Sequence, residues 1–529
     1  MGTETEFGVI APEKPEANPT VLSAQVVNTY DTMFRRELAS TNTSTWEYDS
    51  ESPLADARGF EMEESEADAS QLTHRRHELT SEDIAAEALA ESGMFAERLD
   101  WDAVTMNSIL PNGARFYVDH AHPEYSSPEI TSPMDAVLWD AAGDYIAAQT
   151  VETIARLAPQ TGLPIVNLYK NNADSKGQSY GFHENYQIRR DVDFDSVITG
   201  LLPFFVSRQI ITGAGRVGLG VNGERPGFQI SQRADFFERT VGLETTIRRP
   251  IINTRDEPHA DQHKYRRLHV IVGDANLSHY STLLKFGTTS AVLGLIEAGA
   301  APHIKLADPV AAIHTVSHDL DLEAELPLAG GGSTTALEIQ HAYLAAARAW
   351  DKNPDQHTQR VFDLWEETLD ALENDLFSLA DRLDWVAKYF VLRQYVSKGV
   401  GWDDPKLAAI DLQYSDVRPG KGLYHKLVQL GRMRTLFTPE QIADAAAHPP
   451  EDTRAFLRGR LISTFPDQVV SANWDTLVVR TSGKDGVVRY PMQEPLHNTK
   501  VEVAEHLDQS RNASDLMRRL ERAVADAQC

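Results

Sequence analysis

The sequence Asn112-Gly-Ala-Arg-Phe-Tyr-Val-Asp-His-Ala-His-Pro-Glu-Tyr125 contains the pattern on which the fold prediction depends. Side chains of a β-strand point alternately to its two faces, so Arg115, Tyr117 and Asp119 share one face of a predicted strand. Phe116 and Val118 lie on the other face. The segment therefore predicts a strand with an apolar face toward a core and a polar face that could carry chemistry.

Three further segments repeat this spacing of polar side chains two residues apart. They are residues 2–9, 181–185 and 267–272. A single strand of this kind is typically half exposed, with its polar face in solvent. Four of them are better explained by one sheet with a shared polar face. That face would carry Glu4, Glu6, Arg115, Tyr117, Asp119, His183, Asn185, Arg267 and His269.

Carboxylates gathered on one face of a sheet would repel one another unless cations lay among them. Carboxylates with a few imidazoles and no thiolate favour a hard divalent ion such as Mg²⁺ or Mn²⁺ over structural zinc. Interleaved arginines suit phosphate oxygens, because a guanidinium binds them in a bidentate fork. These arginines are Arg115, Arg233, Arg255 and Arg267. Metal, phosphate and a further carboxylate together suggest nucleotide-dependent chemistry at a carboxyl or amide group.

The two histidines of His120-Ala-His122 admit two interpretations. Histidines two residues apart could ligate zinc. However, His122 precedes Pro123 at a predicted bend, and a role in supporting the turn explains the pair at least as well. Glu124 is a better candidate for a metal ligand, and the role of Glu129 stays open.

Composition narrows the classes of function. The chain has 529 residues and a formal net charge of -28, which disfavours nucleic acid as a partner because its phosphates would be repelled. The only cysteine is Cys529, which excludes an internal disulfide and an interior cysteine nucleophile and is typical of a reducing cytoplasm. We found neither a secretion signal nor the long apolar run of a membrane span. We therefore expect a cytoplasmic protein without a membrane partner.

The order of predicted elements indicates an α+β protein. Between residues 112 and 272, short β-like runs alternate with turns and are interrupted by one helix, over about 135–157. Residues 278–397 are predicted to be mostly helical. We expect a large catalytic domain over 1–430 and a small C-terminal α/β domain over 431–529.

Three glycine motifs have competing interpretations that their surroundings disfavour. Residues 213–218 match the dinucleotide-binding pattern, but the sequence after them cannot open the helix that would receive a pyrophosphate. Residues 177–181 match a nucleophile elbow, but polar residues stand where the strand and helix should be. Residues 330–334 lack the lysine of a P-loop. Each is better explained as a turn.

Five segments resemble the family of Pup ligases and depupylases, whose members attach or remove Pup, a prokaryotic ubiquitin-like protein. The resemblance covers essentially the whole chain. It implies a glutamine-synthetase-like large domain, with a curved, mainly antiparallel sheet packed by helices, plus a small C-terminal domain. The segments are 2–8, 112–125, 169–172, 179–186 and 251–260.

Two features resemble the deamidase/depupylase branch of this family. Its ligases read Asp-Val-Gly-Ser-His-Pro-Glu, whereas this chain has Asp119-His-Ala-His-Pro-Glu124, which is one residue shorter. Residues 47 to 68 carry nine acidic residues and one basic residue, and they resemble an insertion of that branch. We expect an acidic loop over about 45–78 that lies near the active site and gates it.

The resemblance also implies roles for individual residues. Asp119 matches the catalytic aspartate, and Arg255 lies in a motif that faces the reaction centre. The metal positions are Glu4, Tyr117, Glu124, His183 and His269. The positions around nucleotide are Glu6, Ser126, Ser127, Asn185, Arg267 and Trp474, and Arg233 lies in a motif that faces its phosphates. Arg115 joins this nucleotide group as one of the interleaved arginines.

The implied activity is that of an amide hydrolase. It would deamidate the C-terminal glutamine of Pup and cleave the isopeptide bond between Pup and substrate lysines, with Asp119 as nucleophile or base. ATP, or ADP plus phosphate, and Mg²⁺ would be bound cofactors. Pup and pupylated proteins would be its partners, with a functional link to the bacterial proteasome. The alternatives are a Pup–protein ligase, which uses ATP to form the same bond, and a non-catalytic Pup-binding regulator.

Overall fold

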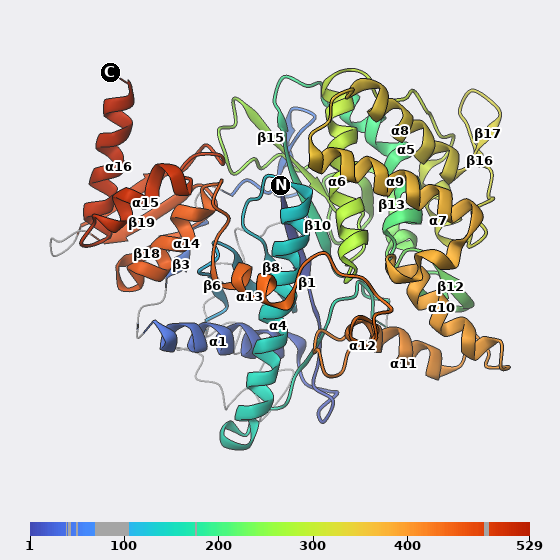
Figure 1. Ribbon diagram of the computed structural model, residues 1–529, viewed down its shortest axis with the longest axis horizontal. Coiled ribbons are helices and arrows are strands. Elements are labelled where there is room, and N and C mark those ends of the chain that lie inside the picture. Colours follow the sequence, from blue (N-terminus) through green and yellow to red (C-terminus); the bar gives the residue numbers. More distant parts are fainter. Residues whose placement is uncertain are drawn as a thin grey trace.

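The computed structural model describes residues 1–38, 40, 44–48, 51–68, 105–174, 177–480 and 486–528. Residues 49, 50 and 69–78 of the predicted acidic loop, and Cys529, lie outside these ranges. Figure 1 shows a sheet in the middle of the molecule, a body of helices on one side of it and the C-terminal elements on the other.

The central sheet has six strands in the order β15-β10-β1-β8-β7-β6, and each neighbouring pair is antiparallel. Strand β1 pairs with β8 and β10, which lie far from it in sequence, whereas β6, β7 and β8 are consecutive along the chain. Their bounds are β1 (Gly2–Glu6), β6 (Asn107–Ile109), β7 (Arg115–Asp119), β8 (His122–Ser126), β10 (Phe182–Arg189) and β15 (Tyr265–Val270).

The register of this sheet places all four predicted polar segments on one face. Glu4 lies opposite His183 on β10 and opposite Ser126 on β8, and Asn185 lies opposite His269. Residues directly opposite each other in an antiparallel pair project to the same face. The prediction of one sheet with a shared polar face is therefore confirmed.

The other face of β1, β7 and β8 is covered by α1 (Pro19–Glu37) and α4 (Pro133–Thr161). A cluster of apolar side chains, including Phe7, Phe116 and Tyr125, fills the space between them. Gly143 of α4 allows the close approach, because a Cβ there would lie 2.4 Å from the ring of Tyr125. The predicted helix over 135–157 is confirmed within α4, which extends beyond it at both ends.

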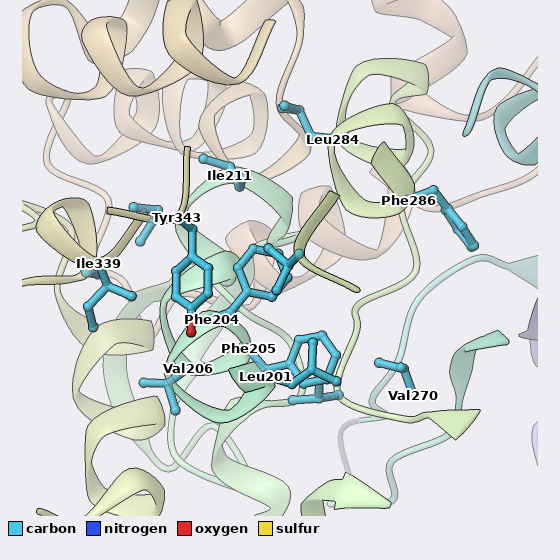
Figure 2. Packing of buried hydrophobic residues seen from close by; sticks show 14 of the residues in the cluster. Leu201, Phe204, Phe205, Val206, Ile211, Val270, Leu284, Phe286, Ile339 and Tyr343 are labelled. Atoms are coloured by element: carbon cyan, nitrogen blue, oxygen red, sulfur yellow. The ribbon is translucent and has the colours of Figure 1, made fainter. Parts of the chain in front are cut away.

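A larger core is built around α5 (Phe194–Thr212), most of whose residues are buried. Figure 2 shows Phe204 of α5 beside Tyr343, and their ring centroids are 5.4 Å apart. The helices that pack here confirm the helical prediction for 278–397. They are α6 (His279–Glu297), α7 (Pro309–His318), α8 (Ala336–Trp350), α9 (Gln356–Asn374) and α10 (Asp384–Val396).

Helix α5 contradicts the prediction of short β-like runs around a single helix between residues 112 and 272. Asp193 caps the helix by accepting a hydrogen bond from the amide of Ser196. Because α5 is apolar on all sides, its sequence lacks the period that distinguishes a helix from a buried strand. Its length and composition would also suit a membrane span, but 72% of its apolar window is buried inside the protein.

The remaining described elements outside the C-terminal unit are short strands, two 3-10 helices and two helices. They are β2 (Gly8–Ile10), β4 (Ala55–Asp56), β5 (Phe60–Glu61), β9 (Asn167–Tyr169), β11 (Arg216–Leu219), β12 (Arg225–Gln229), η4 (Ala234–Phe236), β13 (Phe237–Gly242), β14 (Arg249–Asn253), β16 (Leu326–Pro327), β17 (Ser333–Thr334), η5 (Leu376–Asp381), α11 (Pro405–Tyr414) and α12 (Leu423–Gln429).

The C-terminal elements form a second sheet, in the order β20-β19-β18-β3, with its own apolar cluster. Its strand β3 (Thr45–Trp46) comes from the N-terminal region and pairs with β18. Helix α13 (Pro439–Ala447) packs against α4 instead. The domain boundary at 430/431 stays a prediction. The other elements are α14 (Ala455–Thr464), η6 (Pro466–Gln468), β18 (Val469–Ala472), β19 (Thr476–Arg480), β20 (Val487–Pro491), α15 (Lys500–Asp508) and α16 (Ala513–Gln528).

Candidate active site

Two clusters of metal-competent side chains lie side by side on the polar face. In the first, ligand atoms of Glu4, His183 and His269 lie within 4.8 Å of one another. Nδ1 of His183 is 3.1 Å from Glu4 Oε2, and the amide of Asn185 donates to Glu4 Oε1 at 3.0 Å. Arg267 approaches the same carboxylate to 3.6 Å. Glu4 is thus held from three sides.

The charged groups of this first cluster shift one another's pKa values. Burial alone would raise the pKa of Glu4, but the hydrogen bond from His183 and the nearby His269 and Arg267 hold it well below its usual value. Burial and the charge of Arg267 lower the pKa of His269 well below its usual value. A carboxylate beside two imidazoles is a donor set that fits a divalent cation.

The second cluster contains three carboxylates, of Glu6, Asp119 and Glu124, whose oxygens lie within 4.8 Å of one another. Burial, followed by the charges of Asp119, Glu4 and Glu6, raises the pKa of Glu124 well above its usual value. A cation among these oxygens would remove that repulsion, so the residues fit a divalent ion. Glu6, expected beside nucleotide, lies within this carboxylate cluster.

Gly181 explains how the two clusters can approach each other. A Cβ at this position would lie 2.4 Å from Nε2 of His183 and 2.6 Å from Oε1 of Glu6. The strand β10 follows it directly, where a nucleophile elbow would need a helix. The glycine motif at 177–181 is therefore a turn that leaves room for site side chains.

Tyr117 and Arg115 form a stack at the edge of the site. The Arg115 guanidinium carbon lies 3.7 Å from the ring centroid of Tyr117 and 4.2 Å from that of Trp46. Its Nε donates to Asn107 at 3.1 Å and a terminal nitrogen donates to the hydroxyl of Tyr48, also at 3.1 Å. Arg115 thus contacts aromatic rings and these two oxygens, and its expected contact with nucleotide phosphates stays a prediction.

Tyr117 points its hydroxyl toward the carboxylate cluster. It accepts a hydrogen bond from the hydroxyl of Ser126 at 3.4 Å. Burial and the negative charge of Glu124 raise the pKa of Tyr117 well above its usual value. The phenol is therefore neutral near pH 7 and offers a neutral oxygen beside the metal-competent groups.

A pocket opens beside the first cluster. One side is formed by strand residues of the polar face, and the other by the C-terminal unit. Five residues predicted to surround nucleotide line it together: Ser126, Ser127, Asn185, Arg267 and Trp474. Glu6, Arg115 and Arg233 do not line this pocket. Its lining combines apolar and polar side chains, as small-molecule sites commonly do.

Two arginines, the buried Arg233 and the partly buried Arg249, lie near Glu6. The side chain of Arg233 is fully buried and donates to the carbonyls of Ile271 and Gly273. Burial and the nearby Arg249 lower its pKa to about 9, while Glu6 acts in the opposite direction. Arg249 donates to the carbonyl of Ser179 at 2.8 Å. The sequence did not identify Arg249 as a residue near the site. The pair Arg248-Arg249 belongs to no recognisable motif, so it looks the same as a pair of solvent-exposed charges.

Arg255, predicted to be catalytic, lies where the acidic loop meets the polar face. It forms an ion pair with Glu257 at 3.3 Å and a β-bridge with Asp56. Asp56 accepts a hydrogen bond from the hydroxyl of Thr254 at 2.6 Å. The described part of the acidic loop therefore reaches the candidate active site, and its gating role stays a prediction.

Glu129, whose role was left open, is engaged in a buried ion-pair network. Its carboxylate lies 2.7 Å from Nε of Arg454 and also contacts Arg458. Although burial would raise the pKa of Glu129, the two arginines lower it to about 2. Glu129 therefore fastens the C-terminal unit to the strand region instead of joining either metal-competent cluster.

The glycine motif at 213–218 follows α5 and includes the first three residues of β11. Helix α5 ends at Thr212, and β11 begins at Arg216, so no helix opens after the motif. This confirms that the motif does not form a dinucleotide-binding turn.

A family model described as Pup-ligase protein matches residues 1–478 of this chain. The chain belongs to this family. The predicted resemblance is thereby confirmed over most of the chain, including the strands that carry both metal-competent clusters.

Within the Pup-ligase family, relatives with two kinds of name are similar to this chain. A depupylase from Acidothermus cellulolyticus is 45% identical over 98% of both chains. A Pup deamidase/depupylase from Mycolicibacterium smegmatis is 46% identical over 98% of this chain and 99% of its own. A Pup–protein ligase from Kocuria rhizophila is 39% identical over 82% of this chain and 95% of its own.

Solved structures of the family confirm the predicted fold. The chain is similar to the ligase in the crystal structure of the complex between the prokaryotic ubiquitin-like protein Pup and its ligase PafA. The TM-score is 0.74 at 31% identity, over 98% of this chain and 91% of that chain. The structure of the Pup ligase PafA in complex with ADP gives a TM-score of 0.68 at 34% identity, over 88% and 97%.

Proposed function

We propose that this protein is a Pup deamidase/depupylase, an amide hydrolase that acts on the C-terminal residue of Pup. The observation that carries this proposal is the 45–46% identity to depupylases over 98% of the chain, against 39% over 82% for a ligase. The site geometry is compatible with it, because Asp119 lies in a carboxylate cluster on the polar face of the sheet.

The proposed substrates are Pup with a C-terminal glutamine and conjugates between Pup and a substrate lysine. Asp119 would attack the side-chain carbonyl of the Pup residue, or activate water to do so. In either case water supplies the oxygen of the product carboxylate, and ammonia or the lysine amine leaves with a proton. The carboxylate of Asp119 is 31% exposed, so a substrate carbonyl can reach it.

The proposed cofactors are ATP, or ADP with phosphate, and Mg²⁺. The pocket beside Trp474 would hold the nucleoside, and the likeness to the ADP-bound PafA structure supports this placement. Glu4, His183, His269, Tyr117 and Glu124 would hold Mg²⁺, together with Glu6. When bound, Mg²⁺ would supply positive charge for the oxyanion that develops during hydrolysis. Amide hydrolysis is downhill, so nucleotide turnover is not required.

The remaining assignments are also proposals. The expected location is the cytoplasm, and the expected partners are Pup and pupylated proteins, in connection with the bacterial proteasome. The sheet of the large domain would supply the catalytic and metal-binding residues. The C-terminal unit would form one wall of the nucleotide pocket.

One assay separates the candidate activities. Purified protein with ATP and Mg²⁺ is incubated with a pupylated substrate, with glutamine-ended Pup, or with glutamate-ended Pup and an unmodified target. We expect loss of the conjugate and release of ammonia in the first two reactions. New conjugates in the third reaction, with stoichiometric ADP release, would favour the ligase. No change in any reaction would favour a binding protein.

The Trp474→Ala variant is expected to bind nucleotide about 10- to 100-fold more weakly, because stacking of a base on an aromatic ring contributes roughly 1–3 kcal/mol. The dissociation constant would be measured by titration with a fluorescent nucleotide. Trp474→Phe keeps an aromatic face, so its affinity for nucleotide should lie between those of wild type and Trp474→Ala. Trp350→Ala, at a half-exposed tryptophan of α8, is the control. Equal affinity of wild type and Trp474→Ala would place the base elsewhere.

A further inference from the structure

The turn that carries Asp119 has an unusual first residue. Strands β7 and β8 are paired up to Asp119 and His122, so only His120 and Ala121 connect them. His120 has a φ of 53°, in the left-handed region. Two-residue hairpin turns need a positive φ at this position and are usually built with glycine or asparagine. A histidine costs more backbone free energy here than glycine would, which directs attention to the contacts of its side chain.

That side chain is directed at the neighbouring carboxylate. Nδ1 of His120 lies 2.7 Å from Oδ2 of Asp119, which is within the range of a strong hydrogen bond to a charged acceptor. The other members of the carboxylate cluster, Glu6 and Glu124, carry the same charge as Asp119 and would repel it. A hydrogen bond from the imidazole therefore opposes rotation of the Asp119 side chain away from the cluster.

The turn itself is fixed from the outside. The hydroxyl of Ser23, on α1, donates to the carbonyl of Ala121 at 2.9 Å. The ring of His122 stacks on Tyr180 with centroids 4.3 Å apart, and its Nδ1 lies 3.1 Å from the carbonyl oxygen of Phe7. His122 therefore supports the turn, as one of the two sequence interpretations expected. A rigid turn lets His120 hold Asp119 in one orientation.

We infer that His120 is a positioning residue, which uses Nδ1 to hold the Asp119 carboxylate in the orientation that faces the substrate amide. This inference rests on the proposed hydrolase function. The turn alone does not require a histidine at residue 120, because glycine would form the same turn with less strain.

The test compares two replacements that both tolerate the backbone conformation. His120→Gly relieves the turn but removes the hydrogen bond, and His120→Asn keeps a donor. We expect His120→Gly to lower kcat for conjugate cleavage roughly 10- to 100-fold, as for a small misplacement of a reacting group. KM and nucleotide affinity should stay within about twofold. His120→Asn should retain more of the activity, and thermal stability of His120→Gly should not fall below that of wild type.

Added imidazole provides a readout that a purely structural role would not move. The His120 side chain is 28% exposed, so free imidazole can enter the space that His120→Gly leaves and should raise its kcat at least severalfold. The control is His341→Ala, which removes an exposed histidine–carboxylate pair with Glu373 of similar length, 2.9 Å. Its kcat should match wild type with and without imidazole.

The outcomes separate this inference from the proposed function. Absence of cleavage by wild-type protein would remove the hydrolase proposal and this inference with it. Cleavage by wild type with an unchanged kcat for His120→Gly would overturn the positioning role alone. The same would follow if His120→Gly and His120→Asn lost activity equally and imidazole restored neither.

Discussion

Replacing Asp119 by asparagine is expected to abolish conjugate cleavage while leaving nucleotide binding intact. An amide is neither a nucleophile nor a base at neutral pH, so both proposed roles of Asp119 are lost together. Loss of one such group typically lowers kcat by about 10⁴-fold or more. Cleavage would be followed on gels as disappearance of a pupylated substrate, and nucleotide binding by fluorescence titration.

The same substitution should not weaken the fold. The charge of Asp119 is one cause of the raised pKa of Glu124, so a neutral side chain relieves repulsion within the carboxylate cluster. We expect a thermal midpoint equal to or above that of wild type. Asp191→Asn, at an exposed carboxylate paired with Arg189, is the matched control and should cleave normally. Full cleavage by Asp119→Asn would remove Asp119 from the mechanism.

Local periodicity explains which parts of the site could be predicted. The two-residue period of a strand depends only on neighbouring residues, so Glu4 with Glu6 and His183 with Asn185 could be assigned to shared faces. The clusters themselves depend on register between strands that are far apart in sequence. Glu6 lies opposite Glu124 because β1 pairs with β8, and no local pattern states that pairing.

Ion pairs and stacking contacts between distant segments also could not be predicted from the pattern of neighbouring residues. Arg115 reads as a phosphate-binding arginine on its strand, yet Trp46 reaches its guanidinium from the second sheet. Helix α5 was missed for a different reason, since a helix buried on all sides has no polar face to reveal its period. The sequence therefore did not predict which distant residues each polar side chain contacts, and those contacts determine its role.

A buried ion pair joins the sheet to the helical core directly behind the first metal-competent cluster. Glu184 lies between His183 and Asn185 on β10 and faces the opposite side of the sheet. Arg208 of α5 binds its two carboxylate oxygens at 2.7 and 2.8 Å, and both side chains are almost fully buried. Tyr186 donates a further hydrogen bond to Glu184 at 2.7 Å.

Removing one partner of this pair is expected to be among the most destabilising single changes in the chain. Glu184→Leu would leave the guanidinium of Arg208 buried without its counter-charge, at a cost of about 3–5 kcal/mol in the free energy of unfolding. Denaturant unfolding followed by circular dichroism measures this loss. The double variant Glu184→Leu/Arg208→Met removes both charges and should recover most of the lost stability, since well-packed apolar side chains can replace a buried pair.

If the single variant unfolded at the wild-type denaturant concentration, the pair would have no part in holding β10 against α5. If both variants were equally unstable, loss of packing volume and not the unpaired charge would be the cause.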